Sequence, residues 1–438
     1  MRTLAKELKE HVGKKTTVHG WLHKKRLLGG LTFIVVRDRT GLTQALVKEK
    51  DEVEKLRGLQ VGTVLEVSGQ VVADERAPGG VEIHDVTLEV HVPVEAEAPV
   101  EIDKSLDQFH KSDLLDTLFE YRVIGLRNPK EQAVFKVQAE VVEAIRKYLR
   151  SQDFTDMRTP KLLAAATEGG AEVFKFDYFG KEATLAQSPQ FYKQMMVGVF
   201  ERVFEIAPVY RAEPSATTRH MTEYISIDAE MGFITIEDLK KLLSGMMNAV
   251  ADDVWSVCEA EMALWKSPKP VLPKEIPSLT MAEIHQKYSE ATGTKTIGEK
   301  DLRPDEERWI CEYAKESLGS EAVFVTDWPA SEMRFYHKAQ EGKPEFADRF
   351  DLLFRGVEIS TGSMRENRHD VLQKQLVDMA NGDPEAPGFK YFLMAMQAGM
   401  PPHGGFGMGL ERVTQKMIGL QNVKEASLFP RDINRLAP

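Results

Sequence analysis

The most informative part of the sequence is Ala207–Phe233, A-P-V-Y-R-A-E-P-S-A-T-T-R-H-M-T-E-Y-I-S-I-D-A-E-M-G-F. The apolar run Arg202–Tyr210 predicts a strand, small polar residues predict a loop, and the alternating run Tyr224–Phe233 predicts a partner strand. The antiparallel hairpin presents three cations and three carboxylates: Arg211, Glu213, Arg219, His220, Asp228 and Glu230. This set suits a ligand that carries both charges, such as an amino acid plus a nucleotide. The alternative is a surface hairpin with solvated ion pairs.

Two later stretches favour a ligand site. The glycines of Gly404–Arg412, G-G-F-G-M-G-L-E-R, permit close backbone approach just before a predicted helix. The apolar stretch Phe350–Arg365 predicts a strand that carries Asp351 and Glu358. An alternating strand places residues seven apart on opposite faces. We therefore expect a bulge or a turn at Gly356 if the two carboxylates act together.

Together these stretches resemble the signature motifs of class II aminoacyl-tRNA synthetases. The hairpin with R-A-E resembles motif 2, and G-x-G-x-E-R at residues 407–412 resembles motif 3. The stretch Val134–Arg150 followed by Phe154–Pro160 resembles motif 1, a helix and a strand that ends in proline. Three motifs in the right order are far more specific than one. The resemblance implies an α+β catalytic domain, an antiparallel sheet flanked by helices, that joins an amino acid to tRNA with ATP.

The N-terminal 90 residues predict a separate β-barrel. Turn signals separate five short apolar stretches, and a helical stretch at Glu52–Leu59 lies between the third and the fourth. This pattern indicates a five-stranded OB-fold barrel. The predicted strands are Thr16–Leu22, Leu31–Arg37, Leu42–Val47, Thr63–Val72 and Val81–Val90.

Four residues of this barrel are candidates for contact with a tRNA anticodon. Phe33 and Gln44 fall on the second and third strands, where an exposed Phe could stack on a base and Gln could read a base edge. The alternative for Phe33 is packing in the core. The resemblance adds His23 and His84 and implies relaxed specificity, for tRNA(Asp) and also tRNA(Asn). The alternatives are two ordinary surface histidines and an enzyme strictly specific for tRNA(Asp).

Composition and charge are those of a globular protein with a local basic region. The 438 residues carry a net charge of −11, and 42% are hydrophobic. Residues 1–50 hold twelve Lys or Arg and four Asp or Glu, a net +8, whereas residues 51–105 hold four and thirteen, a net −9. The early excess indicates a phosphate-binding surface, the alternative being a solvated charged face.

Location and redox state are also constrained. No apolar run approaches the ~20 residues that a membrane span needs, and the N-terminus lacks a signal-peptide core. The two cysteines, Cys258 and Cys311, are far apart and have no metal-ligand spacing, which indicates free thiols and a cytoplasmic location.

The chain divides at a Pro/Glu/Ala-rich linker, residues 91–105. We expect a barrel domain with its linker at 1–105, a hinge at 106–130 and a catalytic domain at 131–438. The helix Val134–Arg150 has an apolar stripe with a period near 3.6 residues. The resemblance implies that this helix forms a homodimer interface. The alternative is burial within one subunit.

A further stretch bears on the amino acid. Ala186–Gln194, A-Q-S-P-Q-F-Y-K-Q, resembles the signature of the aspartyl branch of the family, in which Lys193 would meet the anionic side chain of the substrate. Without the resemblance, a lone lysine is more often a surface charge. The spacer at 237–320 is too short for the large extra domain of bacterial-type enzymes, so the chain resembles the compact archaeal type.

The resemblance implies a reaction in two steps: L-aspartate attacks the α-phosphorus of ATP, and the aspartyl group then passes to tRNA(Asp). Catalysis would rest on positioning and charge by Arg211, Glu358 and Arg412. Aspartate would be held by Glu168, Gln190, Lys193, Arg211, Asp228, Thr361 and Arg365. ATP would be held by Arg211, Glu213, Arg219, His220, Met221, Glu358, Gly409, Leu410, Glu411 and Arg412.

Mg²⁺ would bind the phosphates through Asp351, Glu358 and Thr361. The archaeal pattern has Ser where this chain has Thr361, and threonine keeps the hydroxyl. The competing interpretations are an asparagine–tRNA ligase, a non-catalytic tRNA-binding paralogue and an amide-forming synthetase with the same catalytic fold.

Overall fold

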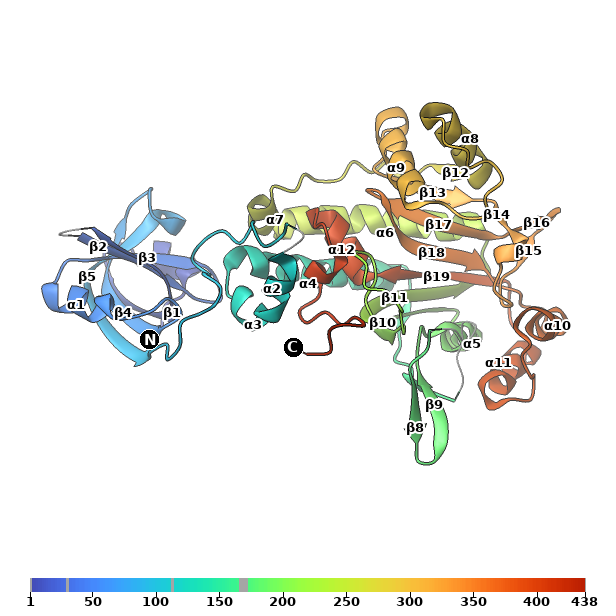
Figure 1. Cartoon of the computed structure of the whole chain (residues 1–438), viewed down its shortest axis with the longest axis horizontal. Coiled ribbons are helices and arrows are strands. Elements are labelled where there is room, and N and C mark those ends of the chain that lie inside the picture. Colours follow the sequence, from blue (N-terminus) through green and yellow to red (C-terminus); the bar gives the residue numbers. More distant parts are fainter. Residues whose placement is uncertain (1, 29–30, 112–113, 165–171, 438) are drawn as a thin grey trace. The chain divides into compact units, whose positions relative to one another are not determined.

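The computed structural model describes residues 2–28, 31–111, 114–164 and 172–437. They form two compact units, Met1–Pro129 and Lys130–Pro438 (Figure 1). No helix within the described residues is both long enough and apolar enough to cross a membrane. The two cysteines are free and buried, as predicted.

The N-terminal unit is built on a closed five-stranded barrel, which confirms the predicted OB-fold. The strand order is β1-β2-β3-β5-β4, with β3 and β5 parallel and every other neighbouring pair antiparallel. The 3-10 helix η1 (Ala5–His11) and the helix α1 (Lys50–Arg57) pack on the barrel, and the short helices α2 (Leu115–Glu120) and α3 (Arg122–Gly125) follow it in the chain. The strands are β1 (Lys15–Leu28), β2 (Leu31–Arg37), β3 (Leu42–Val47), β4 (Val64–Ala73) and β5 (Val81–Val92).

Strand alternation fixes what the barrel buries. On β2, Ile34 and Val36 are buried in the barrel core, whereas Phe33 lies on the partly exposed outer face. Gln44 lies on the outer face of β3 in the same way. Core packing of Phe33 is therefore wrong as an interpretation, and a stacking role stays open to it.

Part of the predicted basic surface is structural. The Lys25 ammonium donates to the carbonyls of Leu56, Arg57 and Leu59, which end helix α1. Arg37 is buried, and its guanidinium lies 4.9 Å from the ring centre of Trp21. These two cations have partners within the barrel, and the phosphate-binding role of the other basic residues stays a prediction.

The C-terminal unit is built on an eight-stranded sheet in the order β12-β13-β17-β18-β19-β11-β10-β6 (Figure 1). The six inner strands are antiparallel, as predicted, but both outer pairs are parallel, so the sheet is mixed. The predicted strand Phe154–Pro160 shrinks to the two residues of β6. The strands are β6 (Thr155–Asp156), β10 (Arg202–Tyr210), β11 (Glu223–Gly232), β12 (Ser278–Thr280), β13 (Ala322–Thr326), β17 (Arg349–Phe354), β18 (Val357–Met364) and β19 (His403–Gly409).

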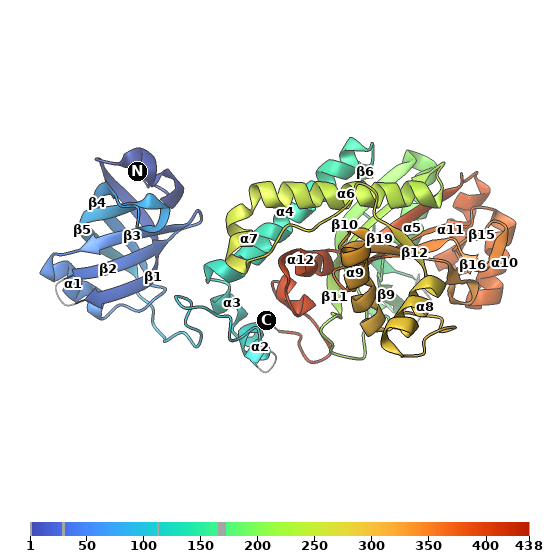
Figure 2. The ribbon, with the colours of Figure 1, turned by 90° about the horizontal axis from the view of Figure 1, so that it is seen from above.

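Helices α4 and α6 run alongside each other over one face of this sheet (Figure 2). The predicted stripe of α4, including Val137, Val141 and Ile145, is fully buried against the sheet and α6. The apolar stripe is therefore core of this unit. The homodimer interface stays a prediction, and on this helix only the face opposite the stripe could supply it. The helices of this unit are α4 (Pro129–Ser151), α5 (Gln190–Phe200), α6 (Ile236–Val257), α7 (Glu259–Trp265), α8 (Met281–Thr292), α9 (Pro304–Leu318), α10 (His369–Ala380), α11 (Pro387–Gln397) and α12 (Leu410–Ile418).

Two smaller sheets flank the large one, each with three short strands. One has the order β7-β9-β8 and the other β14-β16-β15. Their bounds are β7 (Leu162–Leu163), β8 (Lys175–Tyr178), β9 (Lys181–Leu185), β14 (Trp328–Pro329), β15 (Ala339–Gln340) and β16 (Lys343–Ala347).

The stretch Phe350–Arg365 is a hairpin and not the single strand that its apolar content predicts. Strand β17 ends at Phe354, β18 begins at Val357, and Gly356 takes a φ of +82° in the turn between them. The turn expected at Gly356 is therefore present, and the register also shifts between Leu352 and Leu353.

A substitution in the α4 stripe tests whether these residues stabilise the core of one subunit or a contact between two subunits. Val141→Ala removes two buried methyl groups and should lower the free energy of unfolding of the C-terminal unit by about 2–3 kcal/mol. Glu143→Ala, on the exposed side of the same helix, should change it by less than ~0.5 kcal/mol. Both values come from urea unfolding followed by circular dichroism. If Val141→Ala leaves stability unchanged but weakens self-association in sedimentation, the stripe is an interface.

Candidate active site

The two faces of strand β11 carry different kinds of side chain, apolar on one face and acidic on the other. Ile227, Ala229 and Met231 point into the hydrophobic core under the sheet. Strand alternation therefore turns Asp228 and Glu230 to the opposite face, away from α4 and α6. The acidic pair of the hairpin is thus held in place by the apolar residues between its members.

Asp228 and Glu230 belong to a buried network with two cations. The Lys193 ammonium, from α5, donates to Asp228 Oδ1 at 2.9 Å and lies 3.6 Å from Glu230 Oε2. Arg365, just after β18, donates to Glu230 through Nε at 2.7 Å and Nη2 at 3.1 Å. All four side chains are at most 4% exposed. Although burial alone would raise the pKa of Glu230, Arg365 and Lys193 hold it below its ordinary value.

Gly405 makes room for this network. A side-chain Cβ at Gly405 would lie 2.0 Å from Glu230 Oε2, closer than real atoms approach. The Gly405 carbonyl also accepts from Arg365 Nη2 at 3.1 Å. The first glycines of the G-G-F-G-M-G stretch therefore permit a carboxylate, and not only a ligand, to lie against the backbone of β19.

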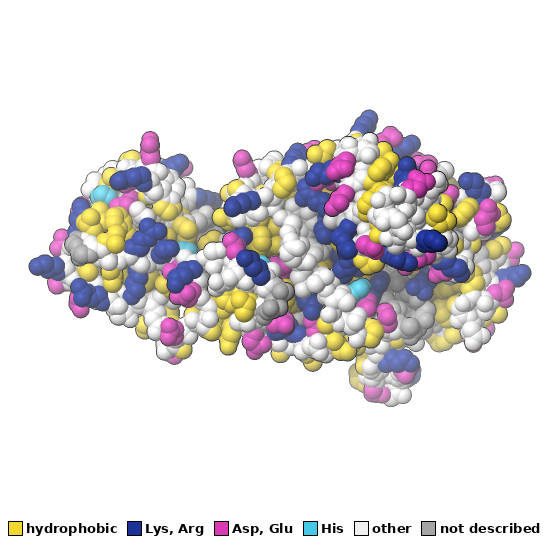
Figure 3. Space-filling model, turned by 45° about the horizontal axis from the view of Figure 1, so that its top comes forward, with side chains coloured by type: hydrophobic (Ala, Val, Ile, Leu, Met, Phe, Trp, Pro, Cys, Tyr) yellow, Lys and Arg dark blue, Asp and Glu magenta, His cyan; other side chains and the backbone are white. Residues whose placement is uncertain are grey.

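The network borders a cavity of about 560 Å³. Figure 3 shows Lys and Arg side chains (dark blue) gathered beside a hollow on the surface of this unit. Most residues predicted for the substrates line the cavity. They are Gln190, Lys193, Arg211, Glu213, Arg219, His220, Met221, Asp228, Glu358, Thr361, Arg365, Gly409, Glu411 and Arg412.

Two predicted residues within the described parts of the chain do not line it. The side chain of Leu410 packs in the hydrophobic core. Asp351 is 3% exposed and is absent from the lining, although it lies directly across β17–β18 from Thr361, which lines the cavity. Glu168 lies outside the described residues, so its predicted role stays a prediction.

One group of cavity residues is already held by the protein itself. Arg219 is paired with Glu307 of α9. The guanidinium of Arg412 donates to the carbonyl of Glu358 at 2.8 Å and to that of Arg219 at 3.4 Å. These bonds fix the planar Arg412 group at the cavity wall, an orientation suited to stacking on a base.

Two acid–base groups in the same region are shifted by burial. Burial lowers the pKa of His220, with Arg412 and Arg211 adding to the effect and Glu213 opposing it. Burial raises the pKa of Glu411 to about 7, although Glu411 accepts from the backbone N–H of Ile225. Glu411 therefore braces β11 against α12, and its charge is not firmly fixed at neutral pH.

The β17–β18 hairpin gathers the three predicted metal ligands. Asp351 lies directly across from Thr361, and the Thr361 hydroxyl donates to Glu358 Oε1 at 3.1 Å. Burial raises the pKa of Asp351 to about 6, with Glu358 adding to the effect and Arg349 opposing it. Two neighbouring carboxylates that resist joint ionisation are a donor set that a divalent cation would relieve.

Two buried groups at the cavity have no charged partner of their own among the residues that the structure describes, and of the two only Gln190 was predicted as a substrate contact. His337 is 5% exposed, and burial together with Arg365 and Arg349 holds its pKa well below the ordinary value, so its imidazole is neutral. The amide nitrogen of Gln190 has no hydrogen-bond partner among the described residues, which favours an acceptor on a ligand. No spacing in the sequence signals His337, because its neighbours reach the site only through the fold.

The predicted anticodon residues divide into two groups. His23 is 8% exposed, and burial lowers its pKa, as do Arg37 and Lys24, while Asp103 opposes this. A contact between His23 and a base is therefore wrong for this conformation, and so is the alternative of a surface histidine. Gln44 and His84 remain on the outer face, where Glu82 accepts from Gln44 Nε2 at 2.7 Å and lies 2.9 Å from His84 Nε2.

Comparison with known proteins agrees with this geometry. Residues 115–433 match the family described as tRNA synthetases class II (D, K and N). Residues 16–93 match the OB-fold nucleic acid binding domain. The first match covers the sheet and the whole cavity, and the second covers the barrel.

Relatives match over their whole length. An aspartate–tRNA(Asp/Asn) ligase from Thermus thermophilus is 44% identical, with 100% of both chains covered. An aspartate–tRNA(Asp) ligase from Pyrococcus abyssi is 39% identical, with 97% of both covered. The crystal structure of asparaginyl-tRNA synthetase from Pyrococcus horikoshii with asparaginyl-adenylate is 30% identical, covers 100% of both chains and has a TM-score of 0.90. The chain therefore belongs to the class II tRNA synthetases of the D, K and N group.

Proposed function

We propose that this chain is an aspartate–tRNA ligase, which activates L-aspartate with ATP and transfers it to tRNA. The observation that carries the proposal is the buried Lys193–Asp228–Glu230–Arg365 network at the wall of the cavity. Two buried ion pairs with no net charge form a site that can exchange partners with a charged substrate.

The network accounts for a preference for aspartate over asparagine. Both amino acids bring an ammonium group, which Asp228 would accept in exchange for Lys193. Only aspartate brings a second carboxylate for the displaced Lys193 and for Arg365. Asparagine would leave a buried cation without a counter-charge, and sites of this kind reject a mismatched ligand by large factors.

The fold alone does not decide between these amino acids, since the solved structure with the TM-score of 0.90 is an asparaginyl enzyme. The full-length relatives at 44% and 39% identity are named aspartate ligases. Together with Lys193, they favour aspartate. A non-catalytic paralogue is disfavoured, because Arg211, Glu358 and Arg412 all line the cavity.

The reaction needs no protein nucleophile, because the substrate carboxylate itself attacks the α-phosphorus. Arg211 would bridge that phosphate and the carboxylate through its planar, permanently charged fork. Glu213 would accept from the adenine amino group. Arg219 and His220 would hold the outer phosphates, and Arg412 would stack on the adenine.

Mg²⁺ forms part of the proposal. Glu358 and Thr361 line the cavity, Asp351 lies directly across from Thr361 on the neighbouring strand, and all three offer the hard oxygens that Mg²⁺ selects. The ion, when bound, would neutralise charge on the phosphates. Arg349, which pairs with Asp351 at 2.9 Å, would position that carboxylate.

The proposal extends to two tRNAs. The Thermus thermophilus relative is named for both tRNA(Asp) and tRNA(Asn), and the Pyrococcus abyssi relative for tRNA(Asp) alone. His84, held by Glu82 beside Gln44, is the candidate on the barrel surface for reading the third anticodon base. We expect a homodimer formed through surfaces other than the α4 stripe. A cytoplasmic location fits the two free thiols.

Amino-acid choice is tested by ATP–pyrophosphate exchange. The wild-type chain should use L-aspartate about 10⁴-fold better than L-asparagine in kcat/KM. Lys193→Gln should lower kcat/KM for aspartate far more than for asparagine. The ratio of the two kcat/KM values should therefore fall. Lys181→Gln, an exposed lysine of the same unit, is the matched control. Equal exchange with both amino acids in the wild type would refute the preference for aspartate.

The metal site is tested by removing each carboxylate charge. Glu358→Gln or Asp351→Asn should reduce exchange by about 10²–10³-fold, because phosphate charge loses its stabilisation. Circular dichroism and tRNA binding should stay close to wild type. Glu312→Gln, on the exposed face of α9, is the control and should stay fully active. Normal exchange by both site variants would mean that the carboxylates are only structural.

The barrel is tested by aspartylation of both purified tRNAs at one stated salt concentration, because phosphate contacts make affinities salt-dependent. We expect kcat/KM values for tRNA(Asp) and tRNA(Asn) within about tenfold of each other. Phe33→Ala should reduce both by an amount equal to about 1–3 kcal/mol of stacking and leave exchange unchanged. Val12→Ala is the control. A preference of several hundredfold for tRNA(Asp) would show that the barrel discriminates.

A further inference from the structure

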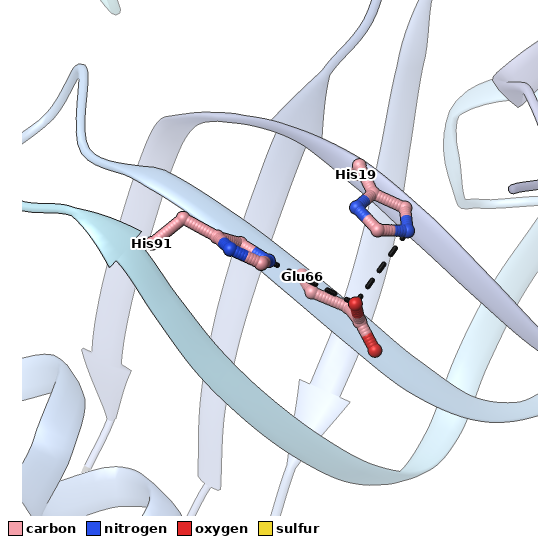
Figure 4. A group of neighbouring side chains, drawn as sticks. All are labelled: His19, Glu66 and His91. Atoms are coloured by element: carbon pink, nitrogen blue, oxygen red, sulfur yellow. Dashed lines mark ion pairs between the residues drawn. The ribbon is translucent and has the colours of Figure 1, made fainter.

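Three side chains with metal-binding atoms converge on the outer surface of the N-terminal barrel, in a unit separate from the cavity (Figure 4). His19 lies on β1, Glu66 on β4 and His91 on β5. Their ligand atoms all lie within 4.8 Å of one another. The side chains are 38%, 26% and 38% exposed, so an ion can reach them from solvent.

The distances suit a shared cation better than direct bonds. Glu66 Oε2 lies 3.5 Å from His19 Nε2 and 3.8 Å from His91 Nε2. Good hydrogen bonds to a carboxylate are shorter than ~3.2 Å. Around Zn²⁺, bonds of about 2.0–2.1 Å at tetrahedral angles place neighbouring ligand atoms about 3.3 Å apart. The two distances from Glu66 are close to that value, and the ligand atoms of the two histidines, within 4.8 Å of each other, would move closer together around the ion.

The strand register brings the three residues together. His19 is the direct cross-strand partner of Glu66 in the β1–β4 pair. In the β4–β5 pair, Leu65 and Val64 face Val90 and Val92, so His91 is an extra residue in β5. Such a bulge re-aims a side chain, and here the His91 ring lies next to the His19 ring, 5.8 Å between centres and 26° between planes.

Residues around the cluster support a ligand role for Glu66. The Ser68 hydroxyl donates to Glu66 Oε1 at 3.3 Å, and Ser68 is itself bonded to the Thr17 hydroxyl at 2.7 Å. One carboxylate oxygen is thus braced, which leaves Oε2 directed at both imidazoles. Glu89, across from Glu66 in the β4–β5 register, adds negative charge to the same face and favours a cation there.

We propose that His19, Glu66 and His91 bind one divalent transition-metal ion of the zinc class. Two imidazoles and one carboxylate suit Zn²⁺ and its neighbours, whereas Mg²⁺ and Ca²⁺ prefer sites made only of oxygen. The remaining coordination position would be filled by water. The ion would tie three barrel strands, β1, β4 and β5, to one centre and so stabilise the barrel by binding the folded state. This inference is independent of the proposed function.

The test uses the full-length chain, treated with a chelator and desalted, in excess Mg²⁺ so that the oxygen-only site of the other unit is occupied. Titration calorimetry with ZnCl₂ should give one Zn²⁺ per chain at this site. His19→Ala, Glu66→Gln and His91→Ala should each weaken that binding by at least 10–100-fold. His11→Ala, a partly exposed histidine of the same unit, should bind as the wild type does.

A second readout is thermal unfolding. Zn²⁺ should raise the midpoint for the wild type and His11→Ala, and not for Glu66→Gln. Circular dichroism of each variant without metal shows whether its barrel is folded. Absence of Zn²⁺ uptake by the wild type would overturn the proposal and leave a cluster of polar contacts between two histidines and a glutamate. Binding that is unchanged in all three cluster variants would also overturn it, because the metal would then lie elsewhere.

Discussion

The active site depends on one constraint: a charge removed from water must meet an opposite charge. Lys193, Asp228, Glu230 and Arg365 satisfy it among themselves, and the neighbouring structure serves that arrangement. The apolar side chains of β11 set the direction of the two acids. Gly405 leaves the space that the Glu230 carboxylate occupies.

This pairing changes how specificity is understood. The sequence alone predicts that Lys193 and Arg365 are two unpaired cations that bind an anionic substrate. In the structure both are already paired with carboxylates, so in the proposed function substrate binding would be an exchange of partners within this network. Specificity then depends on whether the incoming ligand restores every pair, and not on the attraction of a vacant positive site.

Much of the fold could be predicted from the sequence because it follows local patterns. The alternation of β2 and β3, the turn at Gly356 and the helix after Gly409 all depend on residues close in the chain. The site residues within sequence motifs could be predicted for the same reason, because each motif is a local pattern. The partner of the α4 stripe could not be predicted in this way, because a 3.6-residue period shows that one face of a helix is buried and does not show what covers it.

The other errors have a similar origin in long-range contacts. His23 stands in a polar stretch, yet the closing of the barrel buries it. His337 reaches the cavity although nothing in its neighbourhood marks it, and the role of Gly405 needs Glu230, far away in the sequence. The cluster of His19, Glu66 and His91 likewise depends on strand pairing and on one bulge.

A double-mutant cycle on Lys193 and Asp228 measures whether the buried charges of the network stabilise one another. The free energy of unfolding of the C-terminal unit would be measured for Lys193→Met, for Asp228→Asn and for the double variant. Each single variant leaves the buried four-residue network with one uncompensated charge and should cost about 3–5 kcal/mol, while the double variant should cost much less than the sum, with a coupling of ~2 kcal/mol or more. Single effects that add to within ~0.5 kcal/mol would contradict a network in which each charge exists for its partner.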